Sequence, residues 1–457
     1  MTKPPRPTRR PPSPRPRRRE GDDPASKRRP DRTDLVDALV LEVHGLVHDQ
    51  RWLADRALEG ALRRQRALFA SERRAVAEAV YGIVRWQGQL DLLLGGRPSL
   101  ALRYAAWLAR FGGVAPGDAA RRLGVPAGAL SGLAGADARF AAIADPVERL
   151  AAEASLPRWI AARFADELGL EEARALATAM NARAPLTVRA NVLAGSREDL
   201  RARLAAENVL SEPTRFSPWG LVLDGRENAF ALRAFKEGRF EMQDEGSQLI
   251  ALACGARPGW IVVDACAGAG GKSLALAAEM RNKGSLHALD SDADRLDEAR
   301  RRARRAGVHN LRSRAVAAGD EAGAQLQDLA GKADVVLVDA PCSGLGTLRR
   351  KPDARWRLAE GDPERFAATQ RALVRRFAAL VKPGGRFVYA TCSVGRTEND
   401  EVADFAEREV GLRPAPLTPL LGEERWRALG AGASRLQLTP HRHGTDGFFV
   451  AVFEKPR

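Results

Sequence analysis

The sequence predicts an α/β protein whose main part, residues 241–457, folds as a doubly wound, mostly parallel sheet. Short apolar, β-branched runs alternate there with helical segments, which is the pattern of a parallel sheet covered by helices on both faces. Earlier in the chain, apolar residues recur at three- and four-residue spacing, which is typical of helices with one buried face. We therefore expect a tail at 1–32, an all-helical domain at 33–145 and a small α/β connector at 146–240 before the sheet domain.

Length and charge narrow the class of protein. The 457 residues suffice for about three domains at roughly 150 residues each. The net charge of +15 and the pI near 10.4 favour a polyanionic partner such as nucleic acid, although a high arginine content can also be a compositional habit. The sequence holds no apolar run of roughly 18 residues or more, so we expect no membrane span.

Cysteine usage points to the compartment. The four cysteines, at positions 254, 266, 342 and 392, have the spacing of neither a disulfide framework nor a zinc site. The basic amino terminus also lacks the apolar core of a secretory signal. We expect a cytoplasmic, reducing setting and no metal.

Residues 1–32 form a basic, proline-rich tail. They hold twelve Arg or Lys, four acids and nine prolines, so they cannot bury enough apolar surface to offset the entropy of ordering. We expect the tail to be disordered. An arm that holds RNA phosphates and a solubilising tail are both open readings, and an organelle transit peptide is a third.

The next two regions supply helices and a small sheet. Helices separated by breaks at Gly95-Gly96, Gly112-Gly113 and Val125-Pro126 predict a bundle over 33–145. Within the connector we predict two helices over 156–181 with a turn at Gly169, a strand within 184–193, a helix over 196–206, and strands at 219–224 and 229–235. The polar face of the first strand, with Arg189 and Asn191, would contact RNA or solvent.

The sheet domain brings two cysteines to one edge. Its strand candidates are 260–264, 285–290, 311–317, 334–340, 386–392 and a final 448–455, with helices at 272–281, 292–306 and 363–380. Cys342 and Cys392 follow or end two apolar strands. Open α/β sheets bind ligands at the carboxyl ends of their strands, so both thiols can face one pocket and take part in covalent chemistry.

A glycine-rich turn follows the first strand of this domain. In DACAGAGGKS, residues 264–273, the glycines at 268, 270 and 271 allow a tight turn and close approach to a ligand, while the P-loop spacing is absent. The second strand ends at Asp290, and Asp320 follows the third. A carboxylate in that place can accept hydrogen bonds from a ribose diol, so the set predicts a nucleoside cofactor.

These motifs together resemble a known family. VVDACAGAGGKS (262–273), LDSD (289–292), LVDAPCSGLG (337–346), and the ATCS and END segments of 390–400 closely resemble the Sun (Fmu) family of bacterial RNA 5-methylcytosine methyltransferases, which is similar to the RsmB-type ribosomal RNA methyltransferases. The resemblance covers residues 156–457. Residues 72–91 also look like the domain similar to the antitermination protein NusB that some bacterial members carry.

The resemblance implies a fold and a set of partners. It implies a Rossmann-like class I methyltransferase domain at 241–457, a NusB-like RNA-binding domain at 33–145 and a small RNA-binding module at 146–240. The implied cofactor is S-adenosyl-L-methionine. Its implied contacts are Cys266, Ala267, Gly268, Ala269, Gly270, Gly271, Lys272, Asp290, Asp320 and Asp339.

The resemblance also implies catalytic roles. Carbon 5 of cytosine is a poor nucleophile, so a thiolate must first add at carbon 6. In the family this thiolate belongs to the Thr-Cys-Ser motif, here Cys392, and the cysteine after proline, here Cys342, assists proton removal and release. Asp339 would hold the ring nitrogen of the base or the methionine end of the cofactor. The basic triplet Arg349, Arg350 and Lys351 would grip RNA phosphates.

One departure from the family pattern concerns the glycine turn. The family reads Cys-Ala-Ala-Pro-Gly-Gly-Lys, whereas Gly268 and Ala269 stand here in place of Ala and Pro. Losing the proline should loosen the unfolded loop by a fraction of about 1 kcal/mol without removing a hydrogen-bond donor.

The sequence thus predicts a monomeric RNA cytosine-C5 methyltransferase acting on structured RNA, with small-subunit ribosomal RNA expected first. The target cytosine must be flipped or unpaired, because stacking hides carbon 6. Two alternatives stay open: transfer RNA as the substrate, and an RNA-binding ribosome assembly factor that has lost catalysis.

Overall fold

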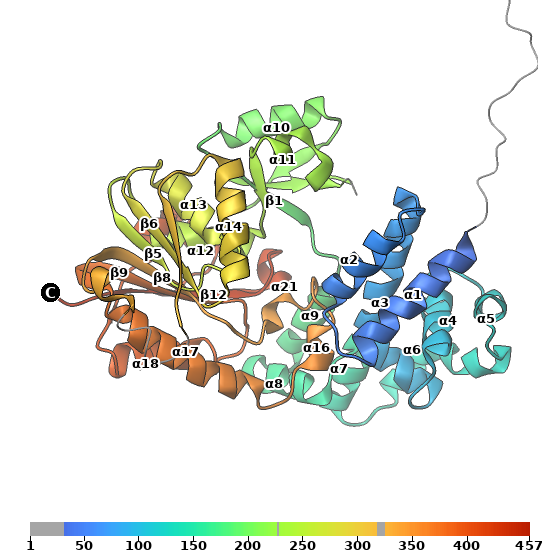
Figure 1. Cartoon of the computed structure of the whole chain (residues 1–457). Coiled ribbons are helices and arrows are strands. Elements are labelled where there is room, and N and C mark those ends of the chain that lie inside the picture. Colours follow the sequence, from blue (N-terminus) through green and yellow to red (C-terminus); the bar gives the residue numbers. More distant parts are fainter. Residues whose placement is uncertain (1–31, 226–227, 318–324) are drawn as a thin grey trace, which may run out of the picture.

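The computed structural model describes residues 32–225, 228–317 and 325–457. The predicted tail, apart from Arg32, and the candidate residue Asp320 lie outside these ranges. Figure 1 shows a helical part, a small α/β part and a large α/β part. Across the described ranges, none of the helices combines the length and the apolar character needed to cross a membrane.

The amino-terminal part is a helical bundle, as predicted. Its elements are α1 (Thr33–His48), α2 (Ala54–Arg64), α3 (Ala70–Leu94), α4 (Leu100–Arg110), α5 (Pro116–Leu123), the 3-10 helix η2 (Ala127–Leu133) and α6 (Ala136–Ala141). The three predicted breaks are confirmed, because α3, α4 and α5 each end one or two residues before them. Gly95 ends α3 with a φ of 82°, a conformation that favours glycine.

Three further helices connect the bundle to the large sheet domain. They are α7 (Pro146–Ala154), α8 (Arg158–Leu168) and α9 (Leu170–Asn181), with Gly169 between the last two as predicted. Their buried side chains share one core with Leu345, Leu348 and Val394. These helices therefore pack against the loops that follow the two cysteine-bearing strands.

The small sheet is antiparallel, with strand order β2-β3-β1-β4. Its elements are β1 (Leu186–Ala190), α10 (Arg197–Ala206), β2 (Ser211–Pro213), β3 (Gly220–Leu223), η3 (Ala229–Ala231), α11 (Arg233–Lys236) and β4 (Phe240–Met242).

The prediction of a strand at 229–235 is wrong: the segment forms the helical turns η3 and α11, because side chains cap their amino-terminal N–H groups. The Asn228 side chain accepts a hydrogen bond from the Phe230 N–H at 3.2 Å, inside η3. The Glu207 carboxylate accepts from the N–H groups of Arg233 at 2.6 Å and Ala234 at 2.9 Å, at the start of α11. Free N–H groups at a helix start bind such carboxylates well.

The polar face of β1 contacts neither RNA nor solvent, which corrects a second prediction. Arg189 and Asn191 are 3% and 7% exposed. Asn191 Nδ2 donates to the carbonyl oxygens of Gly238 and Ala306, both at 2.8 Å. The face is therefore an internal interface, since Ala306 belongs to the sheet domain.

The large sheet has eight strands in the order β10-β12-β9-β8-β5-β6-β7, with β11 paired to β12. Strands β5 to β9 run parallel, and β12 is antiparallel to β9, so the predicted doubly wound, mostly parallel sheet is confirmed. The strands are β5 (Ile261–Asp264), β6 (Ser285–Asp290), β7 (Leu311–Ala315), β8 (Ala333–Asp339), β9 (Val381–Thr391), β10 (Arg413–Pro414), β11 (Arg435–Leu438) and β12 (Phe448–Glu454).

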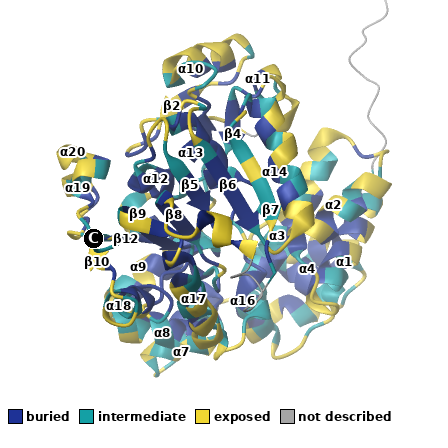
Figure 2. Cartoon of the chain, turned by 60° about the vertical axis from the view of Figure 1, so that its left-hand side comes forward, coloured by how far each residue is buried: buried dark blue, intermediate teal, exposed yellow. Residues whose placement is uncertain are grey.

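Helices cover both faces of this sheet, and its central strands are buried (Figure 2). The helices of the domain are α12 (Glu245–Cys254), α13 (Gly271–Glu279), α14 (Ala293–Ala306), α16 (Ala354–Arg357), α17 (Asp362–Ala378), α18 (Asp400–Arg408), α19 (Thr418–Leu421), α20 (Glu423–Ala428) and α21 (Pro440–His443), with 3-10 turns η4 (Gln327–Leu329) and η5 (Leu345–Thr347).

The short helix α16 fastens the sheet domain to the helical bundle. Arg355 is fully buried, and its Nη1 donates to Ser155 O at 3.1 Å and to Asn181 Oδ1 at 2.9 Å. Trp356 Nε1 donates to Val84 O of α3 at 2.7 Å. The segment after Cys342 is thus held between α3 and α7 to α9.

A pair of glycine substitutions tests this junction. A Cβ at Gly88 would lie 2.7 Å from Trp356 Cη2, so Gly88→Ala should lower the free energy of unfolding by about 1–3 kcal/mol through overpacking. The matched control is Gly60→Ala in α2, where the nearest atom, Arg64 Nη1, is 3.6 Å away. The control should gain about 0.5–1 kcal/mol from helix propensity. Urea titrations of the full chain measure the free energy of unfolding of both variants. Equal values for Gly88→Ala and Gly60→Ala would contradict the tight packing of Trp356 against α3.

Candidate active site

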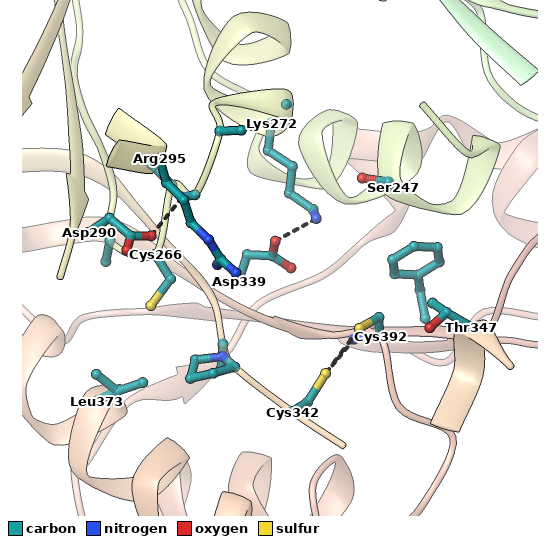
Figure 3. Close-up of a pocket in the computed structure, with 18 of the residues that line it drawn as sticks. Ser247, Cys266, Lys272, Asp290, Arg295, Asp339, Cys342, Thr347, Leu373 and Cys392 are labelled. Carbon is teal, nitrogen blue, oxygen red and sulfur yellow. Dashed lines mark hydrogen bonds and ion pairs between the residues drawn. The ribbon is translucent and has the colours of Figure 1, made fainter. Parts of the chain in front are cut away.

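The ends of β8 and β9 bring two cysteines into contact. The strands pair in parallel with Asp339 opposite Ala390, so the loops that follow leave the sheet side by side. Cys342 Sγ and Cys392 Sγ lie 3.1 Å apart, and the Cys392 N–H donates to Cys342 Sγ at 3.3 Å (Figure 3). The predicted meeting of the two thiols is confirmed.

A buried carboxylate holds both cysteine loops in this arrangement. Glu398, fully buried, accepts hydrogen bonds from the N–H of Ser343 at 2.7 Å and from Ser393 Oγ at 2.7 Å. Ser343 and Ser393 directly follow the two cysteines, so one side chain sets their separation. Gln370 Nε2 of α17 donates to the same carboxylate at 3.2 Å.

Asn399 completes this support. It accepts from Thr391 Oγ1 at 2.6 Å and donates to Ser393 O at 3.1 Å. Glu398 and Asn399 belong to the END segment at 398–400, and the sequence motif alone gave neither residue a role. The END motif could have drawn attention to these two residues, but only the fold shows that they support the cysteine loops.

The hydrogen bond between the sulfurs makes the two thiols unequal. It lowers the pKa of Cys392, as do the nearby charges of Lys272 and Lys351, against the opposing effects of burial and Asp339. The same hydrogen bond, followed by burial, raises the pKa of Cys342 well above its ordinary value. Either sulfur can donate in the 3.1 Å contact, and the two pKa directions favour Cys342 as the donor and Cys392 as the sulfur that ionises first.

A buried ion pair lies beside the thiols. Lys272 Nζ of α13 is 2.6 Å from Asp339 Oδ2 at the end of β8 (Figure 3). Burial lowers the pKa of Lys272, but the charge of Asp339 and its hydrogen bond outweigh burial and raise that pKa above its usual value. The ammonium group stays charged and fixes the Asp339 carboxylate at the cavity wall.

The glycine turn and Asp290 form the other end of the site. Asp290 Oδ2 accepts the N–H of Gly268 at 2.7 Å, and Oδ1 accepts the N–H of Asp292 at 2.9 Å. Gly268 has a φ of 53°, and a Cβ there would meet no atom within 4 Å, so this edge of the turn is open to a ligand.

One cavity of about 1090 Å³ joins the two ends. The predicted residues that line it are Cys266, Ala267, Gly268, Ala269, Gly271, Lys272, Asp290, Asp339, Cys342 and Cys392. Gly270 does not line it: its Cβ would lie 2.9 Å from Ala299 Cβ, so this glycine permits close packing of α14 instead.

Two of the three basic residues predicted to grip phosphate are already paired. Arg349 is buried and forms ion pairs with Asp446 and Asp244, and Arg350 pairs with the same two carboxylates. Both contact the junction between β12, α12 and the cysteine loop, and Arg350 also lines the cavity. Lys351 is exposed and lines the cavity, so it retains the predicted orientation toward a substrate.

Comparison with known proteins identifies the family. A family profile described as "16S rRNA methyltransferase RsmB/F" matches residues 251–454, and a second profile, described as "Methyltr_RsmF/B-like, ferredoxin-like domain", matches residues 156–229. The probable ribosomal RNA small subunit methyltransferase B of Bacillus subtilis is 36% identical over 318 residues, covering 69% of this chain and 70% of that protein. The chain belongs to the RsmB/F family.

Other relatives extend the match. The protein of the same description from Synechocystis is 30% identical over 429 residues, covering 88% of this chain and 95% of its own length. A solved structure, that of PH0851, is 26% identical with a TM-score of 0.75, covering 94% of this chain and all of that one. A methyltransferase homolog from Pyrococcus horikoshii is 28% identical with a TM-score of 0.57, covering 68% of this chain and all of that one.

Membership confirms the resemblance to the Sun family and the class I Rossmann-like fold of the sheet domain. This RsmB/F family member is an RNA (cytosine-5-)-methyltransferase, and its cofactor is S-adenosyl-L-methionine.

The inequality of the two thiols predicts their alkylation behaviour. A thiolate reacts with iodoacetamide and a thiol does not, so the rate for Cys392 should rise through a midpoint below the usual cysteine pKa of about 8.5. Removing the hydrogen-bond donor in Cys342→Ala should move this midpoint to higher pH. Mass spectrometry of peptides alkylated across a pH series measures it.

The control for this series is Cys254→Ala. Cys254 is fully buried, and its thiol donates to Ile250 O at 3.4 Å and forms no hydrogen bond to either paired sulfur among the described contacts, so its removal should leave the Cys392 midpoint unchanged. A midpoint that stays in place in Cys342→Ala would contradict the proton assignment.

Proposed function

We propose that this enzyme methylates carbon 5 of a cytosine in small-subunit ribosomal RNA through a covalent bond from Cys392 to carbon 6. The observation that carries the proposal is the 3.1 Å contact between Cys342 Sγ and Cys392 Sγ, and the lowered pKa of Cys392 supports the choice of Cys392 as the nucleophile. A low-pKa thiolate at the wall of a cavity is an activated nucleophile.

The chemistry follows from the positions of the two sulfurs. The Cys392 thiolate adds to carbon 6, the carbon 5–carbon 6 double bond opens, and its electron pair makes carbon 5 nucleophilic. S-adenosyl-L-methionine supplies the electrophilic methyl group to that carbon. Loss of the proton from carbon 5 then restores the double bond and expels the Cys392 thiolate. Cys342 accepts that proton: it gives up its own thiol proton to water once Cys392 is bonded to carbon 6, and is therefore a thiolate when the elimination begins.

The cavity suits the cofactor as well as the base. The open edge at Gly268 admits close approach of a ligand, and the Asp290 carboxylate retains lone pairs for two ribose hydroxyls. Residues 266–272 would form the loop that binds the cofactor, and Gly270 would support this loop by packing against α14. Asp320 is the remaining proposed cofactor-binding residue. Asp339, fixed by Lys272, would hold the base or the methionine end.

Two features support ribosomal RNA as the substrate. The relatives from Bacillus subtilis and Synechocystis are both described as ribosomal RNA small subunit methyltransferase B. The net charge of +15 suits a polyanion. We propose that the helical bundle is a NusB-like RNA-binding domain and that the enzyme acts as a cytoplasmic monomer. The intact thiol pair disfavours an inactive assembly factor.

Substrate choice is tested with purified RNAs. The enzyme should produce 5-methylcytidine in small-subunit ribosomal RNA, detected by mass spectrometry of digested nucleosides, and not in transfer RNA. Methylation of transfer RNA alone would favour that alternative, and no product with either RNA would favour the assembly factor.

The roles of the two cysteines predict different trapped species. Cys342→Ala should form the bond to carbon 6, receive the methyl group and then stall, so a denaturation-resistant protein–RNA adduct should accumulate with RNA and cofactor. Cys392→Ala and the double variant should form none and lose methylation by at least about 10³-fold. Denaturing gels with labelled RNA measure this. An adduct that accumulates in Cys392→Ala instead would exchange the two roles.

A further inference from the structure

The glycine turn is tied down by two arginines from outside the turn. Arg302 Nη1 of α14 donates to Ala269 O at 2.8 Å, and Arg189 Nη1 of β1 donates to Gly271 O at 2.8 Å. On the opposite side the N–H of Gly268 is held by Asp290. The turn is therefore fixed from both sides by side chains of other elements.

Arg302 is itself held by the small sheet. Its Nε and Nη2 donate to Glu241 Oε2 at 3.2 and 2.9 Å. Glu241 belongs to β4, is 3% exposed, and also pairs with Arg305. The planar guanidinium thus joins a buried carboxylate of the small sheet to a backbone carbonyl of the cofactor turn, which a single ammonium group cannot span in the same way.

This turn needs external support more than the family's usual turn. Its residues 268–271 include three glycines, with positive φ at Gly268 and Gly270, and Ala269 stands where the family has proline. Glycines lose more conformational entropy on ordering than other residues, and a proline would have limited that loss. Hydrogen bonds to the carbonyls at 269 and 271 restrict the turn in the folded state instead.

We propose that Arg302 is a positioning residue for S-adenosyl-L-methionine, and that the small sheet orders the cofactor turn through Glu241 and Arg302. The small sheet would then set cofactor affinity in addition to any contact with RNA. The inference rests on the proposed placement of the cofactor against residues 266–272 and Asp290.

The chain offers a matched control for Arg302. Arg305 lies on the same helix, pairs with the same Glu241 carboxylate and is similarly exposed, at 23% against 18% for the side chain of Arg302. It makes no hydrogen bond to the glycine turn among the described contacts; its guanidinium lies over the Phe235 ring. Either substitution leaves Glu241 with one arginine, but only loss of Arg302 frees the Ala269 carbonyl.

Titration calorimetry of the full chain with S-adenosyl-L-methionine tests the proposal. Arg302→Ala should weaken binding by about tenfold or more, whereas Arg305→Ala should bind within about twofold of the unaltered enzyme. Arg302→Lys keeps a charge beside Glu241, which protects folding, and should still bind severalfold more weakly. In steady-state assays Arg302→Ala should raise KM for the cofactor and leave KM for RNA and kcat at saturating cofactor unchanged.

Two outcomes would overturn the inference. One is unaltered cofactor affinity in both Arg302 variants; the other is an equal loss in Arg302→Ala and Arg305→Ala, which would mean that Glu241 pairing matters only for general stability. Asp290→Ala is titrated alongside, so that failure of the positioning role of Arg302 can be distinguished from failure of the proposed cofactor site. If Asp290→Ala binds weakly while the Arg302 variants bind normally, the positioning role fails and the site stands. If all variants bind normally, the placement of the cofactor fails too.

Discussion

Parallel pairing of β8 with β9, closed by the Glu398 carboxylate, is the constraint on which the site depends. The pairing brings the two strand ends together, and Glu398 binds the residue after each cysteine, so the sulfurs have little freedom to separate. Burying a charged carboxylate is costly unless its lone pairs are satisfied, and the donors from Ser343, Ser393 and Gln370 satisfy them. The arrangement is therefore stable only when both loops are in place, and the hydrogen bond between the thiols then gives them different proton affinities.

The other parts of the chain meet at the same sheet edge. Helices α7 to α9 pack on the loops after β8 and β9, and α16 fastens the cysteine-bearing segment to the helical bundle. The small sheet reaches the cofactor turn through Arg189 and Arg302. Each accessory region thus supports one half of the site, so removal of either region would change the site as well as the proposed RNA-binding surface.

Much of this architecture was predictable from sequence. The five parallel strands and the strand-end thiols follow from local patterns, since buried strands have continuous apolar runs and the glycine turn has a fixed place after the first. The errors concern residues whose partners lie far along the chain. Local sequence suggested that four side chains were surface groups: Arg189, Asn191, Arg349 and Arg350. Three of them, Arg189, Asn191 and Arg349, instead form hydrogen bonds with residues 47 to 115 positions away in the sequence. The helical turns at 229–236 depend on Glu207, which no local pattern links to them.

The central claim is that Cys392, and not Cys342, attacks the base. It is tested most directly with the unaltered enzyme and RNA carrying 5-fluorocytosine. Elimination requires loss of a proton from carbon 5, and the fluorine that replaces this hydrogen cannot leave as F⁺, so the covalent intermediate accumulates. After incubation with cofactor and proteolysis, mass spectrometry locates the nucleotide on a peptide. We predict that the modified cysteine is Cys392, with the Cys342 peptide unmodified. A nucleotide attached to Cys342 would contradict the account.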